Sequence, residues 1–217
     1  MADMFWISRL PDAENEVAKI TSFTNLFWML FAYNSLSGPG SGAIISRRYG
    51  EKDFQRTETA IKETIILKLF FGILFNLVGL LFLPDMLKLL GARGEAYELG
   101  LQYGRIMILG LPILYSVYSI FTALCCVANP KLAMTLMIGS NLLNVVLSPL
   151  LMFGWLGLPK WGIVAAAWAT VISVAVMLTI GIRLFFINHV NVRLHLRGTA
   201  PISINSMWKM IWLSVPA

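Results

Sequence analysis

The sequence predicts an all-α integral membrane protein, and three observations lead to this fold class. Of its 217 residues, 58% are hydrophobic and only 13% are charged, and the mean hydropathy is +0.74. Soluble domains carry about 25% charged residues, so a water-soluble fold is excluded. Apolar runs long enough to cross a bilayer recur along the chain. The net charge of +6 is explained by Lys and Arg in cytoplasmic loops, so nucleic acid is not expected as a partner.

The apolar runs divide the chain into a series of expected spans. They are the end of a first span at 1–8, further spans at 20–45, 61–83, 101–127, 132–155 and 162–182, a cytoplasmic connection at 183–209 and the start of a seventh span at 210–217. Residues 20–209 would form the body of one lobe. Because both ends of the chain fall inside helices, we expect a fragment of a longer protein.

The first segment carries a single acid, Asp3, among apolar neighbours. One interpretation is a surface carboxylate near a frayed terminus. The other is an intramembrane carboxylate, which marks a functional site because ionisable groups are costly in hydrocarbon.

The second span is rich in small and polar side chains and ends in the glycine-rich stretch 37–42 (SGPGSG). A phosphate-binding loop is excluded because no strand precedes this stretch and no Lys-Ser/Thr pair follows it. Gly38 and Gly42 are spaced for close helix packing, and Pro39 is expected to kink the helix. We therefore assign this stretch to packing.

Single residues mark the ends and breaks of the middle spans. Lys68 lies within about two turns of the polar end of the third span, so its long stem can reach the interface, and we interpret it as an anchor. Pro112 lies inside the fourth span. Trp155 and Trp161 bracket a tight turn between the fifth and sixth spans and suit an interfacial aromatic belt.

The fifth span carries a stripe of polar side chains. Asn141, Asn144 and Ser148 are separated by three and four residues, so they share one helix face, and Pro149 follows directly. A polar stripe in hydrocarbon is costly unless it meets other helices or water. We therefore expect the stripe to face the interior of a helix bundle.

Loop charges predict the orientation in a cell (inner or plasma) membrane. Since loops alternate sides, those at 47–60, 128–131 and 183–209 share one face, and they carry nine Lys or Arg against five on the opposite face. The positive-inside rule places the first set in the cytoplasm.

No catalytic or metal site is predicted. His189 and His195 lie in a polar connection beside arginines and are interpreted as solvated or headgroup-facing, and the spans contain no HExxH, GxSxG or paired-carboxylate spacing. Cys125 and Cys126 are adjacent, so neither a disulfide framework nor a metal centre is expected. Scattered Asn, Ser, Thr and Tyr suit coordination of ions or protons and a solute path, without a cofactor beyond a coupling H⁺ or Na⁺.

Six groups of short motifs follow one another along the whole chain. They are ADMFWISRL at 2–10, GAIISRRYGEKD at 42–53, LGARGE at 90–95 with YGRI at 103–106 and GLP at 110–112, NPKLAM at 129–134, NVVLSP at 144–149 and GIVAAAWAT at 162–170. In this order they resemble the N-terminal half of a multidrug and toxin extrusion (MATE) transporter, whose cytoplasmic loop after helix two reads S-R-x-x-G-x-x-D.

The resemblance implies a twelve-helix antiporter made of two six-helix lobes, of which this chain would be the first with the start of helix seven. It implies export of organic, often cationic and drug-like compounds, driven by a proton or sodium gradient. The expected partners are a small organic substrate, the lipid bilayer and a C-terminal lobe of the same full-length chain. Two alternatives remain: a lipid-linked oligosaccharide flippase of the same superfamily, with a more basic cavity, and a non-transporting scaffold subunit, without an inward polar stripe.

In some members of the family the N-terminal lobe holds a coupling site. Carried onto this sequence, its positions are Asp3, Asn144, Ser148 and Thr170, with Tyr103 as an addition. Ser148 departs from those members, which have an acid there, so Asp3 is the only carboxylate expected in the cavity. A lone buried carboxylate favours the protonated form, and we expect Asp3 to bind the proton with neutral hydrogen-bonding partners around it.

A rival hypothesis places coupling in the C-terminal lobe, with the polar stripe only lining the solute path. Under either hypothesis, Asn34, Asn141 and Tyr118 are expected to line that path.

Overall fold

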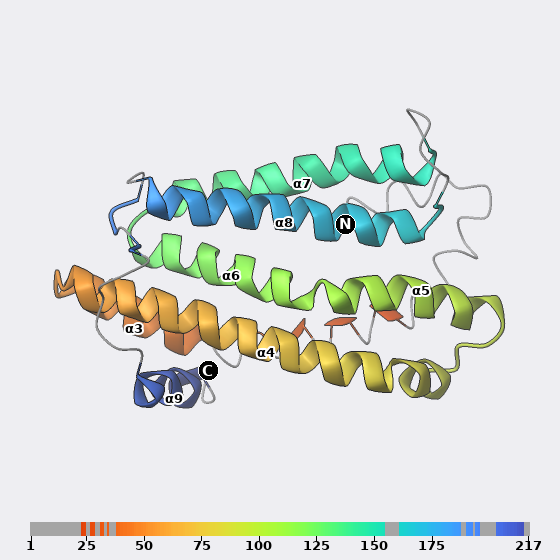
Figure 1. The fold of residues 1–217 in the computed structure, drawn as a ribbon, viewed down its shortest axis with the longest axis horizontal. Helices are drawn as coiled ribbons and strands as arrows, with labels where there is room; N and C mark the ends of the chain where they lie inside the picture. Colours follow the sequence, from red (N-terminus) through yellow and green to blue (C-terminus); the bar gives the residue numbers. More distant parts are fainter. Residues whose placement is uncertain are drawn as a thin grey trace.

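The apolar stretches form long helices laid side by side (Figure 1). The structure, a computed structural model, describes residues 23–24, 27–28, 31–32, 34, 38–154, 161–187, 190–192, 194–195 and 203–214. Its helices of a full turn or more within these ranges are α3 (Gly38–Gly50), α4 (Phe54–Leu89), α5 (Glu95–Leu109), α6 (Leu111–Cys126), α7 (Pro130–Met152), α8 (Val164–Phe186) and α9 (Ile204–Ser214).

Three of these helices, α4, α7 and α8, are each long and apolar enough to cross a membrane. The pair α5 and α6 would make a fourth crossing if taken as one span bent by 44°. Many large apolar side chains on these helices are exposed, including Leu81, Phe82 and Leu142. Outward-facing apolar residues of this kind suit contact with lipid rather than water. The predicted all-α membrane fold is therefore confirmed.

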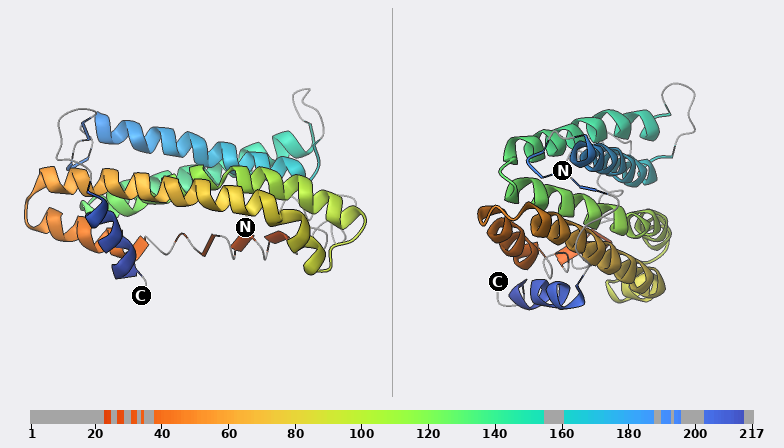
Figure 2. Two further views of the ribbon diagram at one scale, coloured as in Figure 1. Left: turned by 60° about the horizontal axis from the view of Figure 1, so that its bottom comes forward. Right: turned by 60° about the vertical axis from the view of Figure 1, so that its left-hand side comes forward.

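The helices are packed in pairs. The helix α4 runs along α6, α7 runs along α8, and α6 also contacts α8. At one end of the bundle α9 lies across α3 (Figure 2). Two clusters of buried apolar side chains fill the spaces between them, one around Ile108 and Tyr115 and the other around Ile61 and Ile120.

The fourth expected span, 101–127, is broken at Gly110 between α5 and α6. Pro112 has no backbone N–H, so it cannot donate to the carbonyl of Ile108 four residues earlier. The side chain of Asn76 on α4 fills this role, because its Nδ2 donates to the Ile108 carbonyl at 2.9 Å. The helix α4 approaches this break closely, because a Cβ added to Gly72 would lie 2.7 Å from the Cα of Pro112.

The close glycine contact of α3 is made by a different residue from those expected. Nothing lies within 4 Å of a Cβ added to Gly38, and one added to Gly42 would make only ordinary contacts. At Gly40, by contrast, an added Cβ would lie 2.0 Å from the Met210 carbonyl oxygen of α9. The Gly40 N–H, unpaired within the first turn of its own helix, donates to Ser214 Oγ at 2.9 Å. The packing role of the stretch is right, but its assignment to Gly38 and Gly42 is wrong, because the close contact lies at Gly40.

Lys68 does not reach the interface, so its interpretation as an anchor is wrong. Its side chain is only 2% exposed. The helix α4 begins at Phe54, well before the expected span at 61–83, so Lys68 lies about 20 Å along the helix axis rather than near its polar end. It shares the buried face of α4 with Thr64 and Gly72.

The three cationic loops expected on one side meet at the same end of the bundle. Asn191 Nδ2 donates to the carbonyl of Val127, which joins the connection after α8 to the turn between α6 and α7. His195 of the same connection contacts Glu58 in the first turns of α4, with Nδ1 at 3.1 Å from the carboxylate. In Figure 1 this is the left-hand end.

Two buried acids hold the connection on α4. Glu58 accepts hydrogen bonds from the His195 backbone N–H and from Lys62 Nζ at 2.9 Å. Glu63 accepts one from the Ser203 N–H, also at 2.9 Å. Burial alone would raise the pKa of the Glu58 carboxyl, but the hydrogen bonds from His195 and Lys62 together with the Lys62 charge outweigh it, so this pKa lies below its ordinary value.

Candidate coupling site and solute cavity

Two of the predicted coupling residues are joined directly. Asn144 is buried on α7, and its Nδ2 donates to Thr170 Oγ1 of α8 at 3.1 Å. The Thr170 hydroxyl in turn donates to the carbonyl of Ala166, one turn earlier in its own helix, at 3.0 Å. The close packing of α7 on α8 brings these side chains together, and the chain of bonds fixes the direction of the threonine hydroxyl.

A cavity of about 270 Å³ opens beside this pair, between α6, α7 and α8. Its lining residues are Trp28, Leu114, Val117, Tyr118, Phe121, Met137, Ser140, Asn141, Asn144, Thr170, Ser173 and Val174. Aromatic and aliphatic side chains with a few polar groups are typical of sites for small organic molecules, whose usual volumes begin at about 300 Å³. The composition of this wall suits an amphipathic ligand.

The polar stripe of α7 lies partly in the interior of the bundle and partly at its surface. Asn144 and Ser148 are buried, as expected for an inward face. Asn141 is exposed, and its Nδ2 donates to the Met137 carbonyl of its own helix. Asn141 therefore lies at the mouth of the cavity, together with the half-buried Tyr118.

Two other predicted site residues, Tyr103 and Asn34, do not line the cavity. Tyr103 of α5 is buried and packs edge-on against Phe23, with ring centroids 5.5 Å apart, away from the cavity lining. Asn34 has a buried Oδ1 for which the described residues provide no hydrogen-bond donor, and it does not line the cavity either. Asp3, the expected protonation site, lies outside the described residues.

The structure adds Ser173 and Ser140 to the predicted set. Ser173 is buried on α8, three residues after Thr170, and its hydroxyl donates to the Ala169 carbonyl at 2.7 Å. The i, i+3 spacing of Thr170 and Ser173 was a signal of the same kind as the α7 stripe. Ser140 lies four residues before Asn144, so the same helical spacing also places it on this face of α7.

Comparison with known proteins places this fold in a family. The family model described as MatE matches residues 1–150. The probable multidrug resistance protein YoeA of Bacillus subtilis (strain 168) is 31% identical over 157 residues, which are 72% of this chain and 34% of the relative. The multidrug export protein MepA of Staphylococcus aureus (strain MRSA252) is 29% identical over 185 residues, 85% of this chain and 39% of that protein.

Solved structures match over 99% of the chain. The inward-facing conformation of a multidrug resistance MATE family transporter of the MOP superfamily matches with a TM-score of 0.87 at 27% identity, and an outward-facing structure with the same description matches with 0.86 at 26%. A MOP superfamily transporter from Pyrococcus furiosus matches with 0.85 at 27% identity. The chain covers 46–48% of these structures and 34–39% of the two curated relatives. This chain is a multi-pass membrane protein that belongs to the MatE family.

Proposed function

We propose that this chain is the N-terminal lobe of a secondary-active antiporter that exports organic, often cationic compounds, driven by a proton or sodium gradient. The observation that carries the proposal is the Asn144–Thr170 hydrogen bond at the wall of an amphipathic cavity. The names of the two curated relatives, a multidrug resistance protein and a multidrug export protein, support the substrate class.

Coupling in this proposal begins at Asp3. Protonation of this single carboxylate removes its charge, and in this proposal the neutral groups of Asn144, Ser148 and Thr170 accept or donate hydrogen bonds around it. A proton that binds one conformation more tightly than the other shifts the equilibrium between them. The directly bonded pair Asn144–Thr170 would transmit the change to α7 and α8.

Transport by alternating access needs a second lobe that moves against the first. The nearly equal TM-scores to an inward-facing and an outward-facing transporter support a lobe that moves as one body. The C-terminal lobe of the full-length protein is therefore part of the proposal, as the surface that closes the solute path.

The cavity lining favours an exporter of this kind over the alternatives. A flippase for lipid-linked oligosaccharides carries anionic phosphates and needs cationic side chains, and the part of the lining that the structure describes contains no Lys or Arg. A scaffold subunit has no use for a buried polar pair between two spans, whose amide and hydroxyl are costly to bury.

Matched threonine variants on α8 test the role of the polar pair. In the full-length protein, Thr170→Val removes the acceptor for Asn144, whereas Thr179→Val changes an exposed hydroxyl that bonds only within α8. With dye efflux measured in vesicles under an imposed gradient, we expect at least about a tenfold lower rate for Thr170→Val and an unchanged rate for Thr179→Val. The reason is that the free energy lost at the rate-limiting step in Thr170→Val should exceed the contribution of one hydrogen bond. Equal rates would contradict the proposed site.

A second variant separates coupling from the solute path. Asp3→Asn should abolish gradient-driven efflux while leaving substrate binding intact, since the amide keeps the size of the carboxyl but cannot bind a proton. Gradient-driven efflux at the wild-type rate would move coupling to the C-terminal lobe and leave the cavity as a lining of the path.

A further inference from the structure

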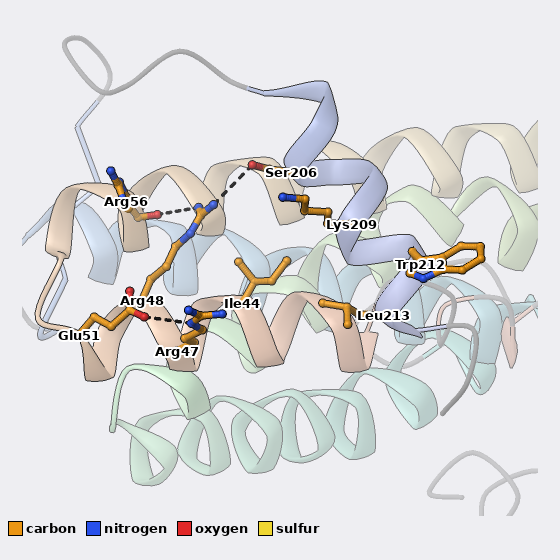
Figure 3. A pocket seen from close by; sticks show the side chains of 9 residues that line it. All are labelled: Ile44, Arg47, Arg48, Glu51, Arg56, Ser206, Lys209, Trp212 and Leu213. Carbon is orange, nitrogen blue, oxygen red and sulfur yellow. Dashed lines mark hydrogen bonds and ion pairs between the residues drawn. The ribbon is translucent and has the colours of Figure 1, made fainter.

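A second, larger cavity lies at the cationic end of the bundle, where the end of α3, the start of α4 and α9 meet (Figure 3). Its volume is about 580 Å³. Its lining residues are Ile44, Arg47, Arg48, Glu51, Arg56, Ser206, Lys209, Trp212 and Leu213. Four of them are cationic and one is acidic, so the cavity favours an anion.

Arg48 ties the walls of this cavity together. Its guanidinium donates to the Arg56 carbonyl of α4 at 3.1 Å and to Ser206 Oγ of α9 at 3.4 Å, as the dashed lines in Figure 3 show. It also lies 3.8 Å from the buried carboxylate of Glu63. Arg48 thus has a structural role, and it fixes the distance between the other cationic groups.

The remaining cationic groups are available to a ligand. Arg47 pairs with Glu51 and Arg56 with Asp53, but both pairs are exposed and join neighbours on one turn of chain. Exposed pairs of this kind contribute little, so an incoming phosphate can displace the carboxylates. Lys209 is exposed on α9, and the described residues provide neither an ion pair nor a hydrogen bond for its ammonium.

The cavity also has an apolar flank. Trp212 and Leu213 line the cavity (Figure 3). The Trp212 side chain is 70% exposed, so it lies at the outer edge of the cavity. Trp208, one turn earlier on α9, is exposed as well. Exposed indole rings beside lysine and arginine are typical of the level of the lipid headgroups. A free phosphate ion would gain nothing from these rings, whereas acyl chains would cover them.

We propose that this cavity binds the phosphate headgroup of an anionic phospholipid from the leaflet that faces the cationic loops. Arg47, Arg56 and Lys209 bind the phosphate oxygens, and the acyl chains lie over Trp212 and Leu213. The bound lipid joins α9 to α3 and α4, adding to the direct contact at Gly40. This site is independent of the proposed export function, because it shares no residue with the cavity between α6, α7 and α8.

Lipid binding by the purified full-length protein in nanodiscs or detergent tests the proposal. The probes are phosphatidylglycerol, zwitterionic phosphatidylethanolamine and inorganic phosphate, with retention measured by native mass spectrometry. The double variant Arg47→Gln with Lys209→Gln should lose roughly 30-fold in apparent affinity for phosphatidylglycerol, about fivefold for each charge removed. Lys131→Gln with Arg183→Gln, which removes two charges from the same end of the bundle outside the cavity, should bind like the wild type.

The outcomes distinguish the sources of the anion. Selective retention of phosphatidylglycerol by the wild type, the control and the charge-conserving variant Lys209→Arg, together with its loss in the cavity variant, supports the site. Equal retention by all variants overturns it. Equal retention of phosphatidylethanolamine overturns it too, and competition by inorganic phosphate as strong as that by the lipid would show a site for free phosphate instead.

Discussion

At the scale of single residues, the amide of Asn76 replaces a backbone donor that Pro112 lacks. We expect Asn76→Leu to destabilise the protein by about 1–3 kcal/mol, because the buried Ile108 carbonyl would lose its side-chain partner. The thermal unfolding midpoint in detergent measures this change.

A double-mutant cycle identifies the cause. Pro112→Ala restores a backbone N–H, which can bind the Ile108 carbonyl as in an unbroken helix. The cost of Asn76→Leu should therefore be smaller in the Pro112→Ala background than in the wild type. An equal cost in both backgrounds would mean that Asn76 acts through packing alone.

Glu58 gives the connection before α9 a dependence on pH. Its pKa is lower in the folded protein than the value of about 4.3 expected in an unfolded chain. Its stabilising effect is then fully present above that unfolded value and is lost as the pH falls below it. We expect faster amide exchange around His195 on acidification below about pH 4, after correction for intrinsic rates. In Glu58→Gln this acid-dependent step should disappear, and its persistence would assign the effect to another group.

Spacing and resemblance together identify two residues that lie in contact, whereas a misjudged helix boundary leads to a wrong assignment. Asn144 and Thr170 follow from a three-and-four stripe and from motif positions, and they meet in the structure. Lys68 is misassigned because the loop expected at 47–60 contains the first turns of α4, which begins at Phe54 with Asp53 as its N-cap. Amphipathic charged first turns are hard to tell from loops by composition.

At the scale of elements, the contact between α3 and α9 depends on one glycine. Gly40→Ala places a Cβ against the Met210 carbonyl and displaces α9, so we expect a loss of about 1–3 kcal/mol and a midpoint lower by at least about 3 °C. Gly38→Ala, two residues earlier in the same helix turn, meets nothing within 4 Å and should change stability by less than about 0.5 kcal/mol. Similar midpoints for the two variants would contradict the close contact.

The helices themselves could largely be anticipated from apolar runs, but their partners could not. A GxxxG spacing marks a surface that can approach another helix closely, without saying which small residue will lie at the crossing point. That point depends on the axis of α9, which is set by the distant contacts of Ser214 and Met210. The bend at Gly110 likewise depends on a donor from α4.

At the scale of the whole molecule, loop charge predicts which end of the bundle faces the cytoplasm. With Cys125 and Cys126 changed to Ser, a cysteine at Lys52 should react with an impermeant maleimide only after the membrane is opened. A cysteine at Arg93, on the opposite end, should react in intact cells. The reverse pattern would invert the orientation.

The arrangement of the loops could be predicted because loops of a multi-pass chain alternate sides. The walls of both cavities could not, because each draws on helices far apart in the chain. Lys209 and Arg47 are separated by most of the sequence, and no local pattern predicts that they line one cavity.

The break between α5 and α6, with its hydrogen bond from Asn76, also has a consequence for membrane insertion during synthesis. A ribosome delivers the chain from its N-terminus, so α4 reaches the bilayer before α5 and α6. An open backbone carbonyl is poorly tolerated in lipid, yet the Asn76 amide that will satisfy it is already in place when the interrupted segment emerges. If α5 and α6 were synthesised before α4, the Ile108 carbonyl would enter the bilayer without its side-chain donor, whereas in the natural order α4 supplies that donor first.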